Sequence, residues 1–141
     1  MQYQEFLNLT AEKISPGTAS EVRQFIAVTL STLGERLYRT GRDNLSAQLP
    51  KELKEDLYLE VDGEAVRTDT ERFPLEEYYQ RVAARADIPY PRAVEVSRKV
   101  IEVLAGAVTP EVLAEVKSRL PEEYEQLFGE APDSPTSPTA V

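Results

Sequence analysis

Two long stretches of this chain place apolar residues three and four positions apart, the spacing that puts side chains on one face of an α-helix. The first runs from Val22 to Leu37, and the second runs from Ala93 to Val108. Each stretch covers about four helical turns. We therefore expect two long helices, over residues 18–39 and 90–107. Helical periodicity dominates the chain, which predicts an all-α fold.

Shorter amphipathic segments surround the first long stretch. A helix around Tyr3 and Phe6 is expected to end at Ser15-Pro16-Gly17, and Thr18 or Ser20 can cap the long helix that follows. Beyond it we expect one helix containing Leu45 and Leu49, and another over residues 51–58 with Pro50 in its first turn.

The same order of elements recurs in the second half. A helix opens near Pro74, and Thr109-Pro110 combines a capping hydroxyl with a proline at the first helical position. A final helix is expected to open at Pro121 and to end near Phe128-Gly129.

A shift of 71 positions aligns the two halves. It brings together several apolar pairs and the two Leu-Pro steps, namely Phe25 with Val96, Leu30 with Ile101, Leu33 with Leu104, and Leu49-Pro50 with Leu120-Pro121. We interpret residues 1–58 and 73–129 as two tandem four-helix repeats that form one compact helical bundle.

Two segments fall outside the predicted repeats. Residues 59–72 form a linker in which Asp62-Gly63 suits the turn of a short hairpin. Residues 130–141 are rich in proline and almost free of large apolar side chains, so we expect a disordered segment there.

The amino-acid composition excludes most familiar kinds of catalytic site. The 141 residues include neither cysteine nor histidine. Disulfides, thiolate nucleophiles, imidazole bases and the metal sites built from these residues are therefore excluded. The Asp62-Gly63-Glu64 segment also fails as a calcium loop, because Tyr58 stands where the first carboxylate would be needed.

Charge narrows the range of partners. There are 25 acidic and 16 basic residues, a net charge of −9, and both halves are acidic. Nucleic acids and anionic membranes attract basic surfaces, so neither is an expected partner. The first residues lack a basic segment of the kind that opens a signal peptide. We expect a soluble cytoplasmic protein.

Three segments resemble one known family. They are Leu45-Ser46-Ala47-Gln48-Leu49-Pro50, its counterpart Val116-Lys117-Ser118-Arg119-Leu120-Pro121, and Phe73-Pro74-Leu75-Glu76-Glu77-Tyr78. Their order and spacing are similar to those of the bacterial domain of unknown function 2267 family (DUF2267), over residues 3 to 128. The resemblance implies a soluble, all-helical, two-unit bacterial protein, and it brings no catalytic or ligand residues with it.

We predict no catalytic, cofactor-binding or metal-binding residues, and no cofactor. The acidic pairs stand at helix starts, where the helix dipole favours them. The expected function is a non-catalytic helical interaction or regulatory module. The alternative is a small-molecule binder or enzyme that uses a cleft between the repeats, lined by Tyr78, Arg81 and Arg85.

Some apolar residues lie beyond the main stripes of the long helices. They are Val28, Val94 and Val103. A helix with so wide an apolar face is either central in its bundle or covered by something else. Central burial is one expectation, and a protein partner or self-association through that face is the other.

Overall fold

The computed structural model describes residues 1–14, 17–37, 39–59 and 73–129. These residues form seven α-helices and one short 3-10 helix, and they contain no β-strand. The elements are α1 (Tyr3–Lys13), α2 (Ala19–Arg36), α3 (Arg39–Ser46), α4 (Lys51–Leu57), α5 (Leu75–Ala86), α6 (Tyr90–Ala107), α7 (Pro110–Ser118) and the 3-10 helix η1 (Glu122–Gln126). The predicted all-α fold is confirmed.

Capping residues set the starts of two helices. Thr18, one of the two predicted caps, accepts the Glu21 backbone N–H at 3.1 Å, and the Glu21 carboxylate accepts the Thr18 N–H at 2.9 Å. This reciprocal capping box satisfies two backbone donors that would otherwise lack partners. Thr109 caps α7 in the predicted way, accepting from the Val112 N–H at 3.3 Å.

Some predicted boundaries were wrong by a few residues. The first long helix ends at Arg36, because Leu37 adopts an extended backbone with φ −86° and ψ 144°. The third helix ends at Ser46, so Leu49 lies beyond it, and Pro50 stands just before α4 instead of within its first turn. The last predicted helix is the tighter 3-10 form. The second long helix has the predicted bounds, 90–107.

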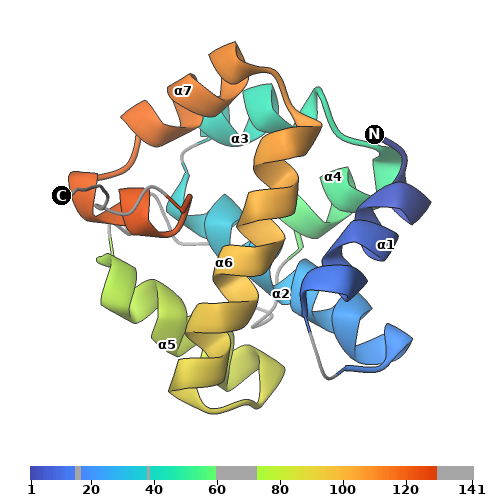
Figure 1. The fold of residues 1–141 in the computed structure, drawn as a ribbon. Coiled ribbons are helices and arrows are strands. Elements are labelled where there is room, and N and C mark those ends of the chain that lie inside the picture. The colour runs from blue at the N-terminus through green and yellow to red at the C-terminus, as the bar shows by residue number, and fades with distance from the viewer. Residues whose placement is uncertain (15–16, 38, 60–72, 130–141) are drawn as a thin grey trace, which may run out of the picture.

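The two long helices occupy the middle of the molecule. In Figure 1, α6 crosses the front and α2 passes behind it. α5 and α1 each pack against both long helices, α4 packs against α2, and α3 lies beside α7. Much of the packing therefore joins elements from opposite halves of the sequence.

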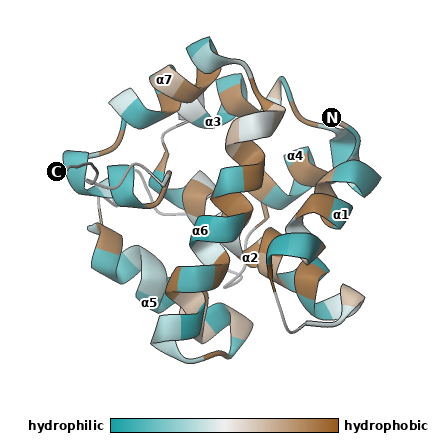
Figure 2. Ribbon diagram, in the orientation of Figure 1, coloured by the Kyte–Doolittle hydropathy of each residue, from teal (hydrophilic) through white to brown (hydrophobic). Residues whose placement is uncertain are grey.

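One continuous apolar core results from this arrangement. It includes residues from every helix, and Phe6, Ile26, Leu30, Leu33, Val96, Val100 and Ile101 are fully enclosed. Figure 2 shows hydrophobic and hydrophilic residues alternating in bands along α1, α5 and α6, as expected for amphipathic helices. Among the described helices, none is both long and apolar enough to cross a membrane.

Two predictions concern residues outside this description. The hairpin around Asp62-Gly63 and the segment 130–141 fall outside the described residues.

Candidate functional site

Tyr78, the first residue of the predicted cleft, belongs to α5, and its side chain is completely buried. Its hydroxyl donates a 2.8 Å hydrogen bond to the backbone carbonyl of Thr29 in α2. Burial is the main cause that raises the pKa of Tyr78 well above its ordinary value of 10. The hydroxyl is therefore a protonated donor that ties α5 to α2.

Arg81 and Arg85, the other two predicted residues, converge on one carboxylate. Glu35 of α2 lies 2.9 Å from the Arg81 guanidinium and 3.0 Å from that of Arg85. Arg81 also pairs with Glu77 one turn earlier at 2.6 Å, as its spacing predicts. Arg85 in addition donates to the Thr32 hydroxyl at 3.0 Å. The structure thus brings the three residues together, each with a partner in the same chain.

A second set of contacts centres on Phe73, two residues before the start of α5. The Phe73 carbonyl accepts two hydrogen bonds, at 2.8 Å from Nε of Arg36 and at 2.7 Å from the Tyr124 hydroxyl. The Arg36 guanidinium lies 5.2 Å from the centre of the Tyr124 ring, and that of Arg81 lies 3.9 Å from the centre of the Phe73 ring. Both distances are within the range of cation–π attraction. α2, α5 and η1 therefore meet at Phe73.

We call this set the Arg–Tyr cluster, defined as Glu35, Arg36, Phe73, Tyr78, Arg81, Arg85 and Tyr124. Glu35, Arg36, Phe73 and Tyr124 were not assigned to this site from the sequence. One signal was available, because Arg36 follows Leu33 by three positions and so stands on the apolar stripe of its helix. Charged residues are almost never buried unless they are paired, and Arg36 is only 7% exposed.

In the Arg–Tyr cluster, arginine and tyrosine side chains donate hydrogen bonds to oxygen atoms of the same chain. Burial raises the pKa of Tyr124 above its ordinary value, although the neighbouring Arg36 opposes the shift. Neither cluster tyrosine is therefore a phenolate at neutral pH. The guanidinium groups of Arg36, Arg81 and Arg85 bind carbonyl, hydroxyl or carboxylate oxygens of the same chain. The arrangement fixes α5 and η1 to α2.

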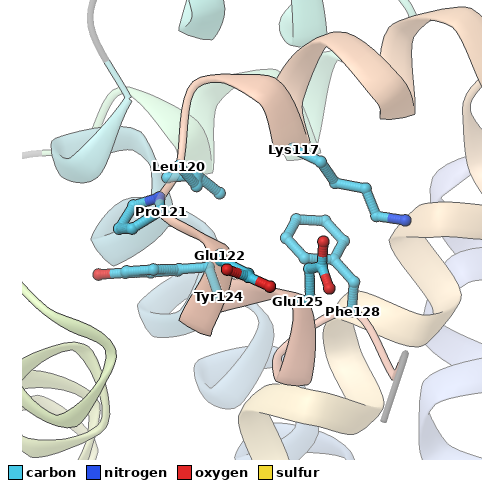
Figure 3. A pocket seen from close by; sticks show the side chains of 7 residues that line it. All are labelled: Lys117, Leu120, Pro121, Glu122, Tyr124, Glu125 and Phe128. Atoms are coloured by element: carbon cyan, nitrogen blue, oxygen red, sulfur yellow. The ribbon is translucent and has the colours of Figure 1, made fainter. Parts of the chain in front are cut away.

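A small hollow lies next to Tyr124, between the end of α7 and η1. Its lining residues are Lys117, Leu120, Pro121, Glu122, Tyr124, Glu125 and Phe128 (Figure 3). The amine of Lys117 lies 5.8 Å from the centre of the Phe128 ring. The cavity volume is about 30 Å³, whereas pockets for small ligands measure about 300 Å³ or more. The hollow accommodates on the order of one water molecule.

A smaller polar group joins α3 to the end of α4. The Tyr58 hydroxyl donates to the Asp43 carboxylate, and the Arg42 guanidinium lies 4.9 Å from the centre of the Tyr58 ring. Burial first, and then the bond to Asp43, raise the pKa of Tyr58 above its ordinary value. Within the described ranges, no three acidic side chains are placed so that they could hold a metal ion.

The predicted additional apolar face is mostly covered by the chain itself. Val28 is 6% exposed and Val103 is 4% exposed, because α2 and α6 lie at the centre of the bundle. Val94 is only half-buried. Central burial therefore accounts for two of the three valines, and the uncovered part of the face lies near Val94.

Comparison with models of known protein families gives a match over most of the chain. A family model described as "Uncharacterized conserved protein (DUF2267)" matches residues 3–127. This range includes every helix described above, and it agrees with the resemblance found in the sequence. A search of curated proteins gave no significant match.

Proposed function

The chain belongs to the DUF2267 family, and we propose that it is a non-catalytic helical interaction or regulatory module whose partner is a protein. One observation carries the proposal. The groups best suited to chemistry, Tyr78, Arg81 and Arg85, are bound to Thr29, Glu35, Glu77 and Thr32 of the same chain. Their role is to join helices, which leaves the outer surface as the functional part of the molecule.

The module consists of two tandem four-helix repeats, 1–58 and 73–129, joined by the linker 59–72 and followed by residues 130–141. Helix bounds support this proposal, since α2 and α6 both have 18 residues. α2 begins at Ala19 and α6 begins 71 positions later, at Tyr90. A contact supports it too, because Nδ2 of Asn44 donates at 2.8 Å to the carboxylate of Glu115, again 71 positions later.

We further propose a bacterial, cytoplasmic protein that does not bind nucleic acid. The support is the family resemblance, the absence of cysteine and the net charge of −9.

A second candidate function is binding of an anionic small molecule at the Arg–Tyr cluster. One observation favours it, namely that the side chains of Arg81 and Glu35 remain 24% and 30% exposed. A carboxylate or phosphate group could then compete with Glu35 for the Arg81 guanidinium.

Thermal unfolding with a panel of metabolites and metal ions separates the two candidates. A ligand at 100 times its dissociation constant adds about 2.7 kcal/mol to the free energy of unfolding. For an interaction module we expect no such shift with any panel member. A reproducible shift that Arg81→Gln removes, and that the exposed control Lys54→Gln leaves in place, would establish the second candidate instead.

Partner binding is the positive half of the test. When the tagged full chain is purified from its native cells, we expect one partner protein to be retained with it, in an amount nearly equal to that of the chain. Tyr78→Phe should leave this retention intact, because the Tyr78 hydroxyl is buried and bound to Thr29. Failure to retain any protein under gentle crosslinking would contradict the proposal.

A further inference from the structure

A half-buried carboxyl group of α4 has no cation beside it. Asp56 belongs to α4, which packs against α1, α2 and α3 (Figure 1). The charges that act on this carboxyl within the described residues are both negative. On the α3 side, Asp43 accepts a hydrogen bond from Tyr58, and Arg42 lies over the Tyr58 ring. The ionised form of Asp56 is therefore unfavourable where it lies.

The two negative charges come from α4 itself. Glu52 stands one turn before Asp56, a spacing that places both on one side of the helix, and Glu55 directly precedes Asp56. Burial is the largest cause that raises the pKa of Asp56, from 3.8 to about 6, and Glu55 and then Glu52 add to the rise. Lys51 of the same helix pairs with Glu55, at 3.9 Å.

Tyr3 brings α1 to this carboxyl. Burial raises the pKa of the Tyr3 hydroxyl above its ordinary value of 10, the charge of Asp56 adds to the rise, and Arg23 of α2 opposes it. Charges act in this way on groups that lie near them. The Tyr3 hydroxyl is neutral between pH 4 and 7, so it does not compensate the charge of Asp56. We call this place the α1–α4 seam, defined by Tyr3, Arg23, Glu52, Glu55 and Asp56.

α1 is held to the bundle by a narrow set of contacts. The enclosed side chains of this segment are Phe6, Thr10 and Ile14, which recur at every fourth position and so form a single stripe. The Thr10 hydroxyl donates within α1, to the Phe6 carbonyl at 2.8 Å. An exposed ion pair, Lys13 with Glu102 at 3.0 Å, links α1 to α6, and exposed pairs of this kind contribute little to stability. Elements with few buried contacts open before the rest of a fold does.

We propose that Asp56 makes the packing of α1 at the α1–α4 seam depend on pH, so that α1 is held firmly in acid and opens more often at neutral pH. Opening uncovers the sides of α2 and α6 against which α1 packs. The inference goes beyond the proposed interaction module and does not rest on it.

The sign follows from the two forms of the protein. The packed form binds the proton of Asp56 more tightly than an open form in which water reaches the carboxyl. Packing of α1 therefore gains most below pH 3.8, and this gain is lost as the pH rises through 6. If opening returns the pKa of Asp56 to 3.8, the open fraction should rise by up to about tenfold between pH 5 and 7.

Amide hydrogen exchange of the full chain, followed residue by residue by NMR, tests the inference. Each measured rate, divided by the intrinsic rate of that amide at the same pH, gives an opening constant. At pH 7 we expect the Thr10 amide of α1 to open at least about tenfold more readily than the Val100 amide of α6. The Thr10 opening constant should fall severalfold from pH 7 to pH 5. Asp56→Asn should abolish this fall, and the exposed control Asp87→Asn should leave it in place.

Either of two results would overturn the inference. Equal opening constants for Thr10 and Val100 at pH 7 would mean that Asp56 acts on the whole fold and not on α1. A Thr10 opening constant that is the same at both pH values, or that still changes in Asp56→Asn, would mean that this carboxyl does not control the α1–α4 seam. The unaltered chain gives the pH dependence without any substitution, so the test does not require the variant to fold. Neither result depends on a partner protein or a metabolite, so the proposed function is tested separately.

Discussion

Gly34 of α2 lies directly against the backbone carbonyl of Leu57 at the end of α4. A β-carbon built on Gly34 would stand 2.1 Å from that oxygen and 3.3 Å from Cδ of Arg42. Glycine in the middle of a helix costs about 1 kcal/mol relative to alanine. Here the missing side chain allows α4 to pack against α2, so the cost has a structural reason.

Gly34→Ala should therefore destabilise the protein severely. The clash is with backbone, which cannot rotate away, and we expect the free energy of unfolding to fall by at least about 2–3 kcal/mol. Gly106→Ala is the matched control, because a β-carbon there meets nothing within 4 Å. That change should be neutral or stabilising by up to about 1 kcal/mol. Urea denaturation of both variants checks the pair, and equal effects would refute the argument.

Gln48 should stabilise the start of α7. Its side-chain carbonyl accepts the Thr109 N–H at 2.9 Å, and its amide donates to the Thr109 hydroxyl at 3.3 Å. We expect Gln48→Ala to lower the free energy of unfolding by about 1 kcal/mol. The control is Gln80→Ala. The Gln80 amide donates only to the Glu76 carboxylate of the same helix, at 3.5 Å. Similar losses in the two variants would mean that the link to α7 contributes nothing.

Thr29→Val should stabilise the protein. The hydroxyl of Thr29 is buried and makes no hydrogen bond with the described residues. Replacing it with a methyl group removes the desolvation cost of an unpaired polar atom, about 1 kcal/mol or more. One helical turn later, Thr32→Val should do the opposite, because that hydroxyl donates to the Val28 carbonyl and accepts from Arg85. Calorimetric melting of the two variants should give shifts of opposite sign.

Asp56 should make the protein less stable as pH rises from 4 to 7. Burial raises the pKa of this carboxyl from its ordinary 3.8 to about 6, and Glu55 and Glu52 add to the shift. The folded state thus binds the proton more tightly than the unfolded state. Its contribution is fully present below pH 3.8 and is lost as the pH rises through 6.

The variant Asp56→Asn should remove this dependence. We expect it to stabilise the protein at pH 7 and to have little effect at pH 4. Asp87→Asn, at an exposed turn, serves as the control and should leave the pH dependence intact. Denaturation curves at the two pH values decide the matter, and a benefit from Asp56→Asn that is equal at both would contradict the assigned cause.

Most helices could be predicted because their signals are local. The apolar spacing between Ala93 and Val108 and the caps at Thr18 and Thr109 depend only on neighbouring residues, and the structure confirms them. Boundaries were less predictable where tertiary packing intervenes. Leu49 continues the helical spacing of its segment, yet the chain leaves the helix after Ser46 and Leu49 is buried beyond its end.

The Arg–Tyr cluster was only partly predictable for the same reason. The pair Glu77–Arg81 follows from a spacing of four. The bond from Arg36 to the Phe73 carbonyl joins residues 37 positions apart, and the acceptor is a backbone atom that has no sequence signature. Glu35 could not be assigned because its partners, Arg81 and Arg85, lie 46 and 50 positions away.

The packing of α2 has a consequence for synthesis of the chain. Its buried face is completed by α5 and α6, and the bonds from Tyr78, Arg81 and Arg85 reach back to it from 46 or more positions later. Contacts between distant positions are slow to form. While the ribosome is still adding residues before α6, only part of the apolar side of α2 is covered, by α1, α4 and α5. Nascent chains should therefore stay sensitive to proteases and open to chaperones until α6 has left the exit tunnel.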